Sequence, residues 1–236
     1  MSKIVELKCL KHKYPDQTEV SACGLDFLIE EGEKVGLVGG NGSGKTTLIM
    51  HLVGMLKPSE GSVSVLGVDP YKDFSKIGKS VGVVVQQVED QLVGPTVEED
   101  IKFSLVNYGF SQQEIEKRTE EVMSRLDIED LKGKVIHYLS GGQKKKVALA
   151  GALVLKPKLL VLDEAFNQID PEGLKKVISL IDDYCDKYGM SVVMAVSNKE
   201  DIKHFNTIYL LEKGKIVFKG TEEELEERGG SQFCSH

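Results

Sequence analysis

Apolar residues along this chain follow strand spacing at both ends and helical spacing in the middle. Over the first ninety residues the pattern predicts strands and turns. The segments that alternate or run apolar are residues 3–10, 19–29, 34–38, 62–66 and 81–86. One helix is expected in this part, from Gly44 to about Leu56, because Lys57-Pro58 disfavours its continuation.

The middle of the chain, roughly residues 90–155, carries start signals for helices. Thr96 and Ser111 each stand three residues before a glutamate, which is the capping-box pattern. The helix that Ser111 opens is expected to reach about Leu126, and a further helix is expected to start just after Ser140.

Strand and helix patterns alternate in the last third. Strands are predicted at residues 159–163 and 192–196, and between them a helix from Pro171, capped by Asp170, to Gly189. A hairpin is predicted from residues 207–211 and 215–219, then a short helix capped by Thr221, then a flexible tail at residues 229–236. The alternation indicates a parallel sheet and therefore an α/β fold.

Composition narrows the class of protein. The chain has 236 residues, is 41% hydrophobic and 28% charged, and has a net charge of −7, which argues against a nucleic-acid partner. No window approaches the length of about 18 apolar residues that a membrane-spanning helix needs. The four cysteines have no zinc-site spacing, so reduced thiols in a cytosolic setting are expected: Cys9, Cys23, Cys185 and Cys234.

Residues 39–46, Gly-Gly-Asn-Gly-Ser-Gly-Lys-Thr, match the phosphate-binding P-loop between a strand and a helix. A Cβ atom at Gly39, Gly42 or Gly44 is expected to block the approach of the backbone to a phosphate. Lys45 is expected to reach the β- and γ-phosphates, and Thr46 to supply a hydroxyl to Mg²⁺.

A continuous apolar strand, residues 159–162, leads into Asp163 and Glu164. In isolation, two acids at this place are more typical of a solvated strand end. Together with the P-loop they predict that Asp163 assists in holding Mg²⁺ and that Glu164 is the general base for the attacking water.

Residues 139–143, Leu-Ser-Gly-Gly-Gln, form a second candidate anion site, here called the signature segment. Ser140 is expected to cap a helix whose first residues, Gly141 and Gly142, leave the N-terminus open to an anion. Gln143 completes the segment. The three lysines that follow, residues 144–146, are expected to be a solvated helix face.

The ordered combination of these three motifs resembles the ABC-type ATPases over nearly the whole chain. The resemblance implies one ABC ATP-binding domain over residues 1–236, with a mostly parallel core sheet, an antiparallel β subdomain and a helical insertion at about residues 90–145. It implies ATP and Mg²⁺ as cofactors. It further implies a head-to-tail dimer with a second ABC ATPase subunit, in which one copy's signature segment closes over the ATP of the other.

The same resemblance assigns further residues by register. Gln86, with Gln87 as a rival one position later, aligns with the glutamine that contacts Mg²⁺ and the water. Tyr14 aligns with the aromatic residue that stacks on adenine. The nucleotide-binding set is then Tyr14, Gly39, Asn41, Gly42, Ser43, Gly44, Lys45, Thr46, Thr47, Ser140, Gly141, Gly142 and Gln143.

Two departures from the family pattern bear on catalysis. Ala165-Phe166 follows Glu164 where the family usually has Pro-Thr. Asn198 stands where the family has a switch histidine that contacts the γ-phosphate, and His204 lies six residues too late to replace it. Asparagine donates a hydrogen bond but carries no charge, which puts full catalytic competence in question and leaves ATP binding intact.

The segment from Gln86 to Phe103 is most similar to the energy-coupling-factor and cobalt/nickel importer ATPases. That similarity implies a peripheral subunit on the cytoplasmic face of the membrane, docked on a separate integral membrane protein. Two other readings stay open: a non-transport ABC ATPase, and a catalytically weak half of a heterodimer. The cargo and the direction of transport are not encoded in these residues.

Overall fold

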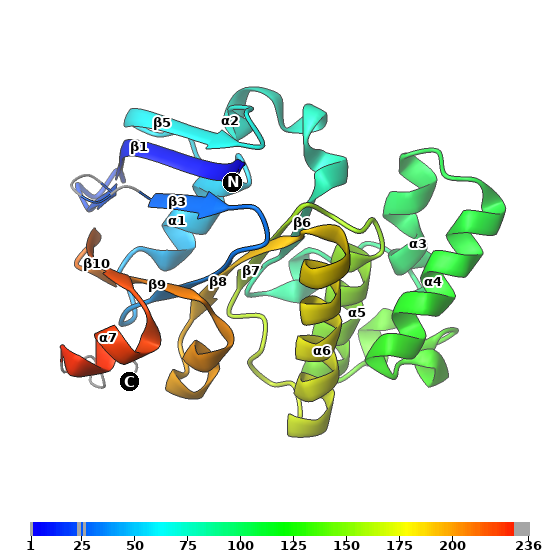
Figure 1. The fold of residues 1–236 in the computed structure, drawn as a ribbon. Coiled ribbons are helices and arrows are strands. Elements are labelled where there is room, and N and C mark those ends of the chain that lie inside the picture. The colour runs from blue at the N-terminus through cyan, green and yellow to red at the C-terminus, as the bar shows by residue number, and fades with distance from the viewer. Residues whose placement is uncertain (1, 23–24, 26, 229–236) are drawn as a thin grey trace. The chain divides into compact units, whose positions relative to one another are not determined.

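The structure, a computed structural model, describes residues 2–22, 25 and 27–228. Two compact units make up the chain (Figure 1). The first contains residues 1–78, 161–164 and 191–236, and the second contains residues 79–160 and 165–190. The tail predicted at residues 229–236 lies outside the described residues.

Strands dominate the first unit. They are β1 (Lys3–Lys13), β2 (Glu19–Ala22), β3 (Phe27–Glu30), β4 (Lys34–Val38), β5 (Glu60–Val65), β7 (Leu159–Asp163, shared with the second unit), β8 (Ser191–Val196), β9 (Thr207–Glu212) and β10 (Lys215–Gly220). Their order is β3-β1-β2-β10-β9-β4-β8-β7, with β5 paired to β1. The helices are α1 (Lys45–Leu52), α2 (Pro70–Asp73), the 3-10 helices η1 (Phe74–Lys76) and η6 (Lys199–His204), and α7 (Glu222–Glu227).

This sheet has an antiparallel part and a parallel part. β1 runs antiparallel to β2, β3 and β5. In contrast, β4 runs parallel to β8 and β9, with Val38 opposite Val196 and Leu210. Every residue of β7 and β8 is buried, as expected for parallel strands covered on both faces. The predicted combination of a parallel core and an antiparallel portion is therefore confirmed.

Two predicted elements differ from the structure. The segment 19–29 is not one strand, because β2 and β3 pair with different parts of β1: Ala22 lies opposite Leu10, and Phe27 lies opposite Leu7. The predicted helix to Leu56 ends at Leu52 instead. Gly54 then turns the chain with φ +72°, and a Cβ atom there would overlap the backbone of Pro70.

The second unit is mainly helical. Its regular elements are β6 (Val81–Val84), α3 (Val97–Asn107), α4 (Gln112–Leu126), α5 (Gly141–Leu153) and α6 (Pro171–Tyr188). α5 contacts α3, α4 and β6, and α4 also contacts α6. The predicted caps are confirmed: Thr96, Ser111 and Asp170 each accept a hydrogen bond from the backbone N–H three residues later.

The hairpin β9–β10 and the capped helix α7 also match the sequence prediction. Short α2 was not predicted; Asp69 caps it by accepting from the Tyr71 N–H at 3.1 Å. The cysteine prediction is wrong for Cys9, which is disulfide-bonded, whereas the Cys185 sulfur is not part of a disulfide. Cysteine spacing could not find this bond, because disulfide formation depends on distances in the folded chain.

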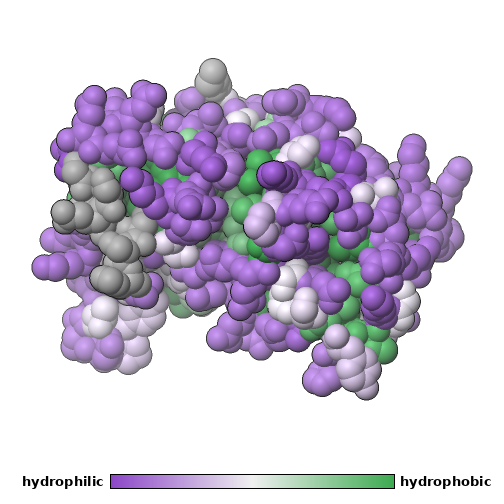
Figure 2. All heavy atoms as spheres, turned by 90° about the horizontal axis from the view of Figure 1, so that it is seen from below, coloured by the Kyte–Doolittle hydropathy of each residue, from purple (hydrophilic) through white to green (hydrophobic). Residues whose placement is uncertain are grey.

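On the face drawn in Figure 2, hydrophilic residues predominate and hydrophobic residues gather in small areas. Among the described residues, none of the helices has the length and apolar character needed to cross a membrane.

Candidate nucleotide-binding site

The P-loop joins the end of β4 to the start of α1. Gly39 (φ +156°) and Gly44 (φ +107°) have backbones that favour glycine. A Cβ atom at Gly39 would overlap the Leu211 carbonyl, and one at Gly44 would lie 2.8 Å from a methyl group of Val20. At these two positions the protein's own packing excludes a side chain, which differs from the predicted reason, access for phosphate. Gly42 has open space, and its φ of +73° is what favours glycine.

The ammonium group of Lys45 lies across its own loop. Its Nζ donates to the carbonyl oxygens of Gly39 at 2.6 Å and Gly40 at 3.1 Å, and the residue is 6% exposed. Within the described residues, the buried hydroxyl of Ser43 has no hydrogen-bond partner. A buried polar group without a partner is costly, and this one stands beside a cation in a glycine loop. These residues fit a bound phosphate, which would accept from both.

A hydroxyl and a carboxylate meet beside the P-loop. Thr46 Oγ1 donates to Asp163 Oδ1 at 3.3 Å, and Asp163 is buried at the end of β7. The described part of the chain contains no group of three or more histidine, cysteine or acidic residues able to hold a metal ion. Mg²⁺ commonly takes one or two protein ligands and completes its shell with phosphate oxygens and water. The pair Thr46 and Asp163 fits that mode.

Glu164 adopts a backbone conformation that is rare for its type. Its φ is +51°, and its N–H donates to the carbonyl of Ala195 in β8 at 3.2 Å. Strained backbone in ordered structure is concentrated at functional sites. Ala165 and Phe166, which replace the family's usual Pro-Thr, are both buried. The strain at Glu164 therefore supports its assignment as a candidate catalytic residue.

Asn198 lies two residues past the end of β8. Because β8 runs parallel to β4, this loop and the P-loop leave the sheet at the same edge. The Oδ1 atom of Asn198 accepts from the Glu200 N–H at 3.1 Å and caps η6. Asn198 itself is exposed. His204 is the last residue of η6, as its late position in the sequence predicted.

Tyr14 follows β1 directly. Its hydroxyl shares a hydrogen bond of 2.8 Å with Thr47 Oγ1 on α1, one residue after Thr46. The turn is closed by the Tyr14 N–H, which donates to the Thr18 carbonyl at 2.8 Å. The first unit thus brings Tyr14 and the P-loop helix together, and stacking of Tyr14 on a base stays a prediction.

The signature segment starts α5 in the second unit. Ser140 forms a complete capping box with Gln143: the Ser140 Oγ accepts from the Gln143 N–H, and the Gln143 side chain accepts from the Ser140 N–H at 3.0 Å. A Cβ atom at Gly142 would lie 2.5 Å from the Gln168 carbonyl, and one at Gly141 would lie 2.6 Å from its side-chain oxygen. Gln168 was not predicted as a site residue. Its left-handed backbone, φ +70°, gives no sequence signal.

The lysine-rich start of α5 is not the solvated face that the sequence predicted. Lys145 is 4% exposed. Lys144 pairs with Glu89 at 3.2 Å, and Lys146 with Asp170 at 3.6 Å. The expectation was wrong because acidic groups distant in the sequence approach this helix turn.

Gln86 and Gln87 are both exposed in the loop after β6. A third glutamine, Gln91, shapes this loop: its side chain donates to the Val83 carbonyl at 2.7 Å and accepts from the Val85 N–H at 3.0 Å. The side-chain amide of Gln91 therefore pairs with backbone groups at the end of β6 in the way that a neighbouring strand would. Its role depends on folded distances, and no motif points to it.

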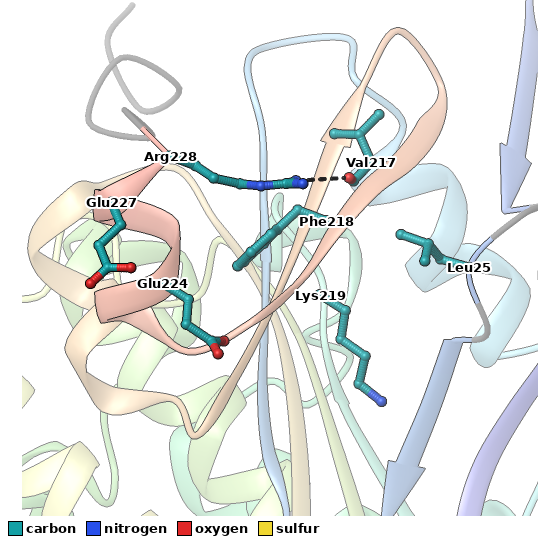
Figure 3. A pocket seen from close by; sticks show the side chains of 7 residues that line it. All are labelled: Leu25, Val217, Phe218, Lys219, Glu224, Glu227 and Arg228. Atoms are coloured by element: carbon teal, nitrogen blue, oxygen red, sulfur yellow. Dashed lines mark hydrogen bonds between the residues drawn. The ribbon is translucent and has the colours of Figure 1, made fainter.

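A separate pocket lies between β10 and α7 in the first unit (Figure 3). Arg228 Nη1 donates to the Val217 carbonyl at 3.4 Å, and the guanidinium lies over the Phe218 ring. None of the predicted site residues lines it. The lining residues are Leu25, Val217, Phe218, Lys219, Glu224, Glu227 and Arg228.

Comparison with known proteins places this geometry in a family. A family model described as ABC transporter matches residues 23–167. The energy-coupling factor transporter ATP-binding protein EcfA of Methanococcus maripaludis is 38% identical over 226 residues, 94% of this chain and 81% of that protein. EcfA1 of Clostridium novyi is 36% identical over 228 residues, 94% of this chain and 81% of that protein.

Solved structures agree. CbiO1 of Clostridium perfringens, described as part of the ABC transporter complex cbiONQ, superposes with a TM-score of 0.84 at 32% identity, covering 97% of this chain and 92% of that one. An ATP-binding cassette dimer bound to ADP and Pi superposes with a TM-score of 0.83 at 25% identity, covering 92% of this chain and 98% of that one. Together with its P-loop and signature segment, these matches show that the chain belongs to the ABC transporter family and has the fold of its ATP-binding domains.

Proposed function

We propose that the protein is the ATP-binding and ATP-hydrolysing subunit of an importer of the energy-coupling-factor or cobalt/nickel type. The observation that carries the proposal is the arrangement at one sheet edge. Lys45 and the unpartnered Ser43 hydroxyl form a phosphate cradle beside the Thr46–Asp163 pair. The likeness to EcfA and CbiO1 over nearly the whole chain supports the transporter assignment.

Each residue then has a role toward MgATP. Lys45 and the loop N–H groups hold the phosphates, Tyr14 stacks on the base, and Thr46 with Asp163 holds Mg²⁺. When bound, Mg²⁺ neutralises charge on the phosphate oxygens. Glu164 accepts a proton from the attacking water. Gln86 and Asn198 orient that water and the γ-phosphate.

The signature segment has its role in a dimer. The N-terminus of α5, with Gly141 and Gly142 at its start, presents backbone N–H groups suited to a phosphate. We propose that it closes over the ATP of a second ABC subunit, and that this ATP-driven closure moves the membrane partner. Mixing the chain with a paralogous ATPase distinguishes a second copy from a paralogue in this role.

The membrane partner would dock on the second unit, near Gln86. α3 exposes Phe103 and Val106, three residues apart on one helix face, at 52% and 58%. Exposed apolar side chains gathered on one element are typical of interaction sites. Docking there would hold the protein at the membrane surface without any lipid-spanning segment.

A catalytically weak half of a heterodimer is the second candidate. Asn198 favours it, since its side-chain oxygen is engaged in capping η6. The deciding experiment measures steady-state phosphate release by the purified chain, alone and with its membrane subunit and any paralogous ATPase. Turnover by the chain with its membrane subunit supports the proposed function. Turnover only after a paralogue is added supports the second candidate, and no phosphate release under any of these conditions would overturn both.

A further inference from the structure

Two histidines lie behind Tyr14 and belong to none of the motifs. The rings of His12 and Tyr14 have centroids 4.5 Å apart with planes at 74°, and the rings of His12 and His51 have centroids 4.9 Å apart with planes at 66°. Both contacts are edge-to-face, a favourable arrangement for aromatic pairs. The three rings therefore form one continuous row of contacts with His12 in the middle, here called the ring cluster (Tyr14, His12, His51).

The inner end of the ring cluster, His51, is buried in the protein. His51, on the last turn of α1, is 1% exposed, and its Nδ1 lies 2.9 Å from the Leu56 carbonyl. His12 is seated in turn by a contact of 3.3 Å between its Nδ1 and the Lys57 carbonyl. Burial, and to a smaller extent the electrostatic effect of the neighbouring His12, lower the pKa of His51 to about 4, so the His51 ring is neutral near pH 7 and packs as an uncharged group.

The outer end of the ring cluster, Tyr14, is held by the first turn of α1, directly after the P-loop. The Tyr14 hydroxyl shares a hydrogen bond with the Oγ1 atom of Thr47, which stands two residues after Lys45. Tyr14 is thus held at its hydroxyl by the first turn of α1 and at its ring, through His12 and His51, by the last turn. A side chain already ordered in its binding position loses less conformational freedom when a ligand binds.

We propose that His12 is a positioning residue for nucleotide binding, which presets the Tyr14 ring as a platform for a purine base. The inference rests on the proposed function, because it takes the ligand of the P-loop to be a nucleoside triphosphate. His12 touches neither phosphate nor base; it acts through Tyr14. Its loss should weaken only the part of the affinity that comes from the base.

The test compares MgATP with magnesium tripolyphosphate, which has the phosphates and no base. Isothermal titration calorimetry on the full chain gives both affinities for the parent and for His12→Ala, His12→Phe and Tyr14→Ala. His12→Ala should weaken MgATP by about three- to tenfold while tripolyphosphate binding is unchanged. His12→Phe, which keeps a ring against Tyr14, should stay within about twofold of the parent. Tyr14→Ala should lose at least as much as His12→Ala.

Each outcome is decisive. His12→Ala with parental MgATP affinity, or with a parallel loss for tripolyphosphate, would overturn the positioning role, and failure of His12→Phe to restore binding would do the same. His12 is only partly buried, so its alanine variant is expected to fold, and a thermal melt checks this. A parent chain that binds neither ligand would overturn the proposed function itself, which is a different result.

Discussion

The hydroxyl of Thr46 donates to the carboxylate of Asp163 over 3.3 Å, although the two residues are 117 positions apart in the chain. The bond connects the first turn of α1 with the end of β7. Strand and helix order alone places both groups at the same sheet edge. The contact fixes them as neighbours, so a cation bound to one would meet the other.

Replacing Lys45 with alanine should weaken ATP binding by about 10- to 100-fold, because a charge-assisted contact to phosphate is lost. The same substitution removes two hydrogen bonds to the loop carbonyls of Gly39 and Gly40. Titration with MgATP measures the effect, and the exposed Lys203→Ala is the matched control. Affinity and turnover within twofold of the parent would sink the P-loop assignment.

The variant Glu164→Gln should bind ATP yet hydrolyse it about 10²- to 10⁴-fold more slowly, since the general base is removed. Neutralising the carboxylate also removes repulsion of the γ-phosphate, so the ATP-bound dimer should accumulate. Phosphate release and size-exclusion chromatography with MgATP report the two effects. Glu200→Gln serves as the control. A fully active Glu164→Gln variant would contradict the role.

Exchanging Asn198 for histidine should raise turnover by between a few-fold and about a hundredfold, because one lost donor to a developing charge costs about 10²–10³ and asparagine retains an N–H donor. ATP affinity should change little. Histidine Nδ1 can still accept from the Glu200 N–H, so a loss of the cap, which costs about 1 kcal/mol, should not appear in the melting temperature. Unchanged or reduced turnover in the assembled dimer would mean that the loop works with asparagine as it stands.

Introducing aspartate at Phe103 should uncouple the ATPase from its membrane partner. A charge on the exposed face of α3 opposes apolar docking, and the side chain is far enough exposed, at 52%, to leave the fold intact. Co-purification with the membrane subunit should fall while ATP binding persists. Tyr71→Asp, at an exposed aromatic in the first unit, is the control. Normal complex formation by Phe103→Asp would place the docking surface elsewhere.

Buried His51 should make the fold sensitive to acid. Its pKa is lowered from 6.5 to about 4 by burial and by His12, so the unfolded chain takes up the proton first. The neutral ring makes its whole contribution to the free energy of unfolding above pH 6.5. That contribution is lost as the pH falls from 6.5 towards 4. The loss amounts to about 3 kcal/mol. Chemical denaturation of the parent and of His51→Gln at pH 7 and pH 4.5 should show a smaller decrease for the variant; equal decreases would refute it.

Sequence reasoning reached the parts of the fold that local patterns encode. The strand at residues 34–38, the strand at 159–163 and the end of α4 at Leu126 match the structure, because turn, cap and apolar signals lie next to them. The bend between β2 and β3 escaped prediction, since it depends on how both strands pair with β1. The lysine ion pairs, Gln91 and Gln168 escaped for the same reason: their partners are set by tertiary folding.

Within the second unit, the signature helix has an immediate mechanical neighbour. The close approach of Gly142 to the Gln168 carbonyl leaves no room for a methyl group between them, and Gln168 stands only four residues after Glu164. A displacement of the start of α5 would therefore move Gln168, and the short backbone segment from Gln168 back to Glu164 would transmit that movement. In the proposed dimer, ATP bound at one nucleotide site would change the position of the catalytic loop that serves the other site. Hydrolysis at each site would then depend on whether the other site holds ATP.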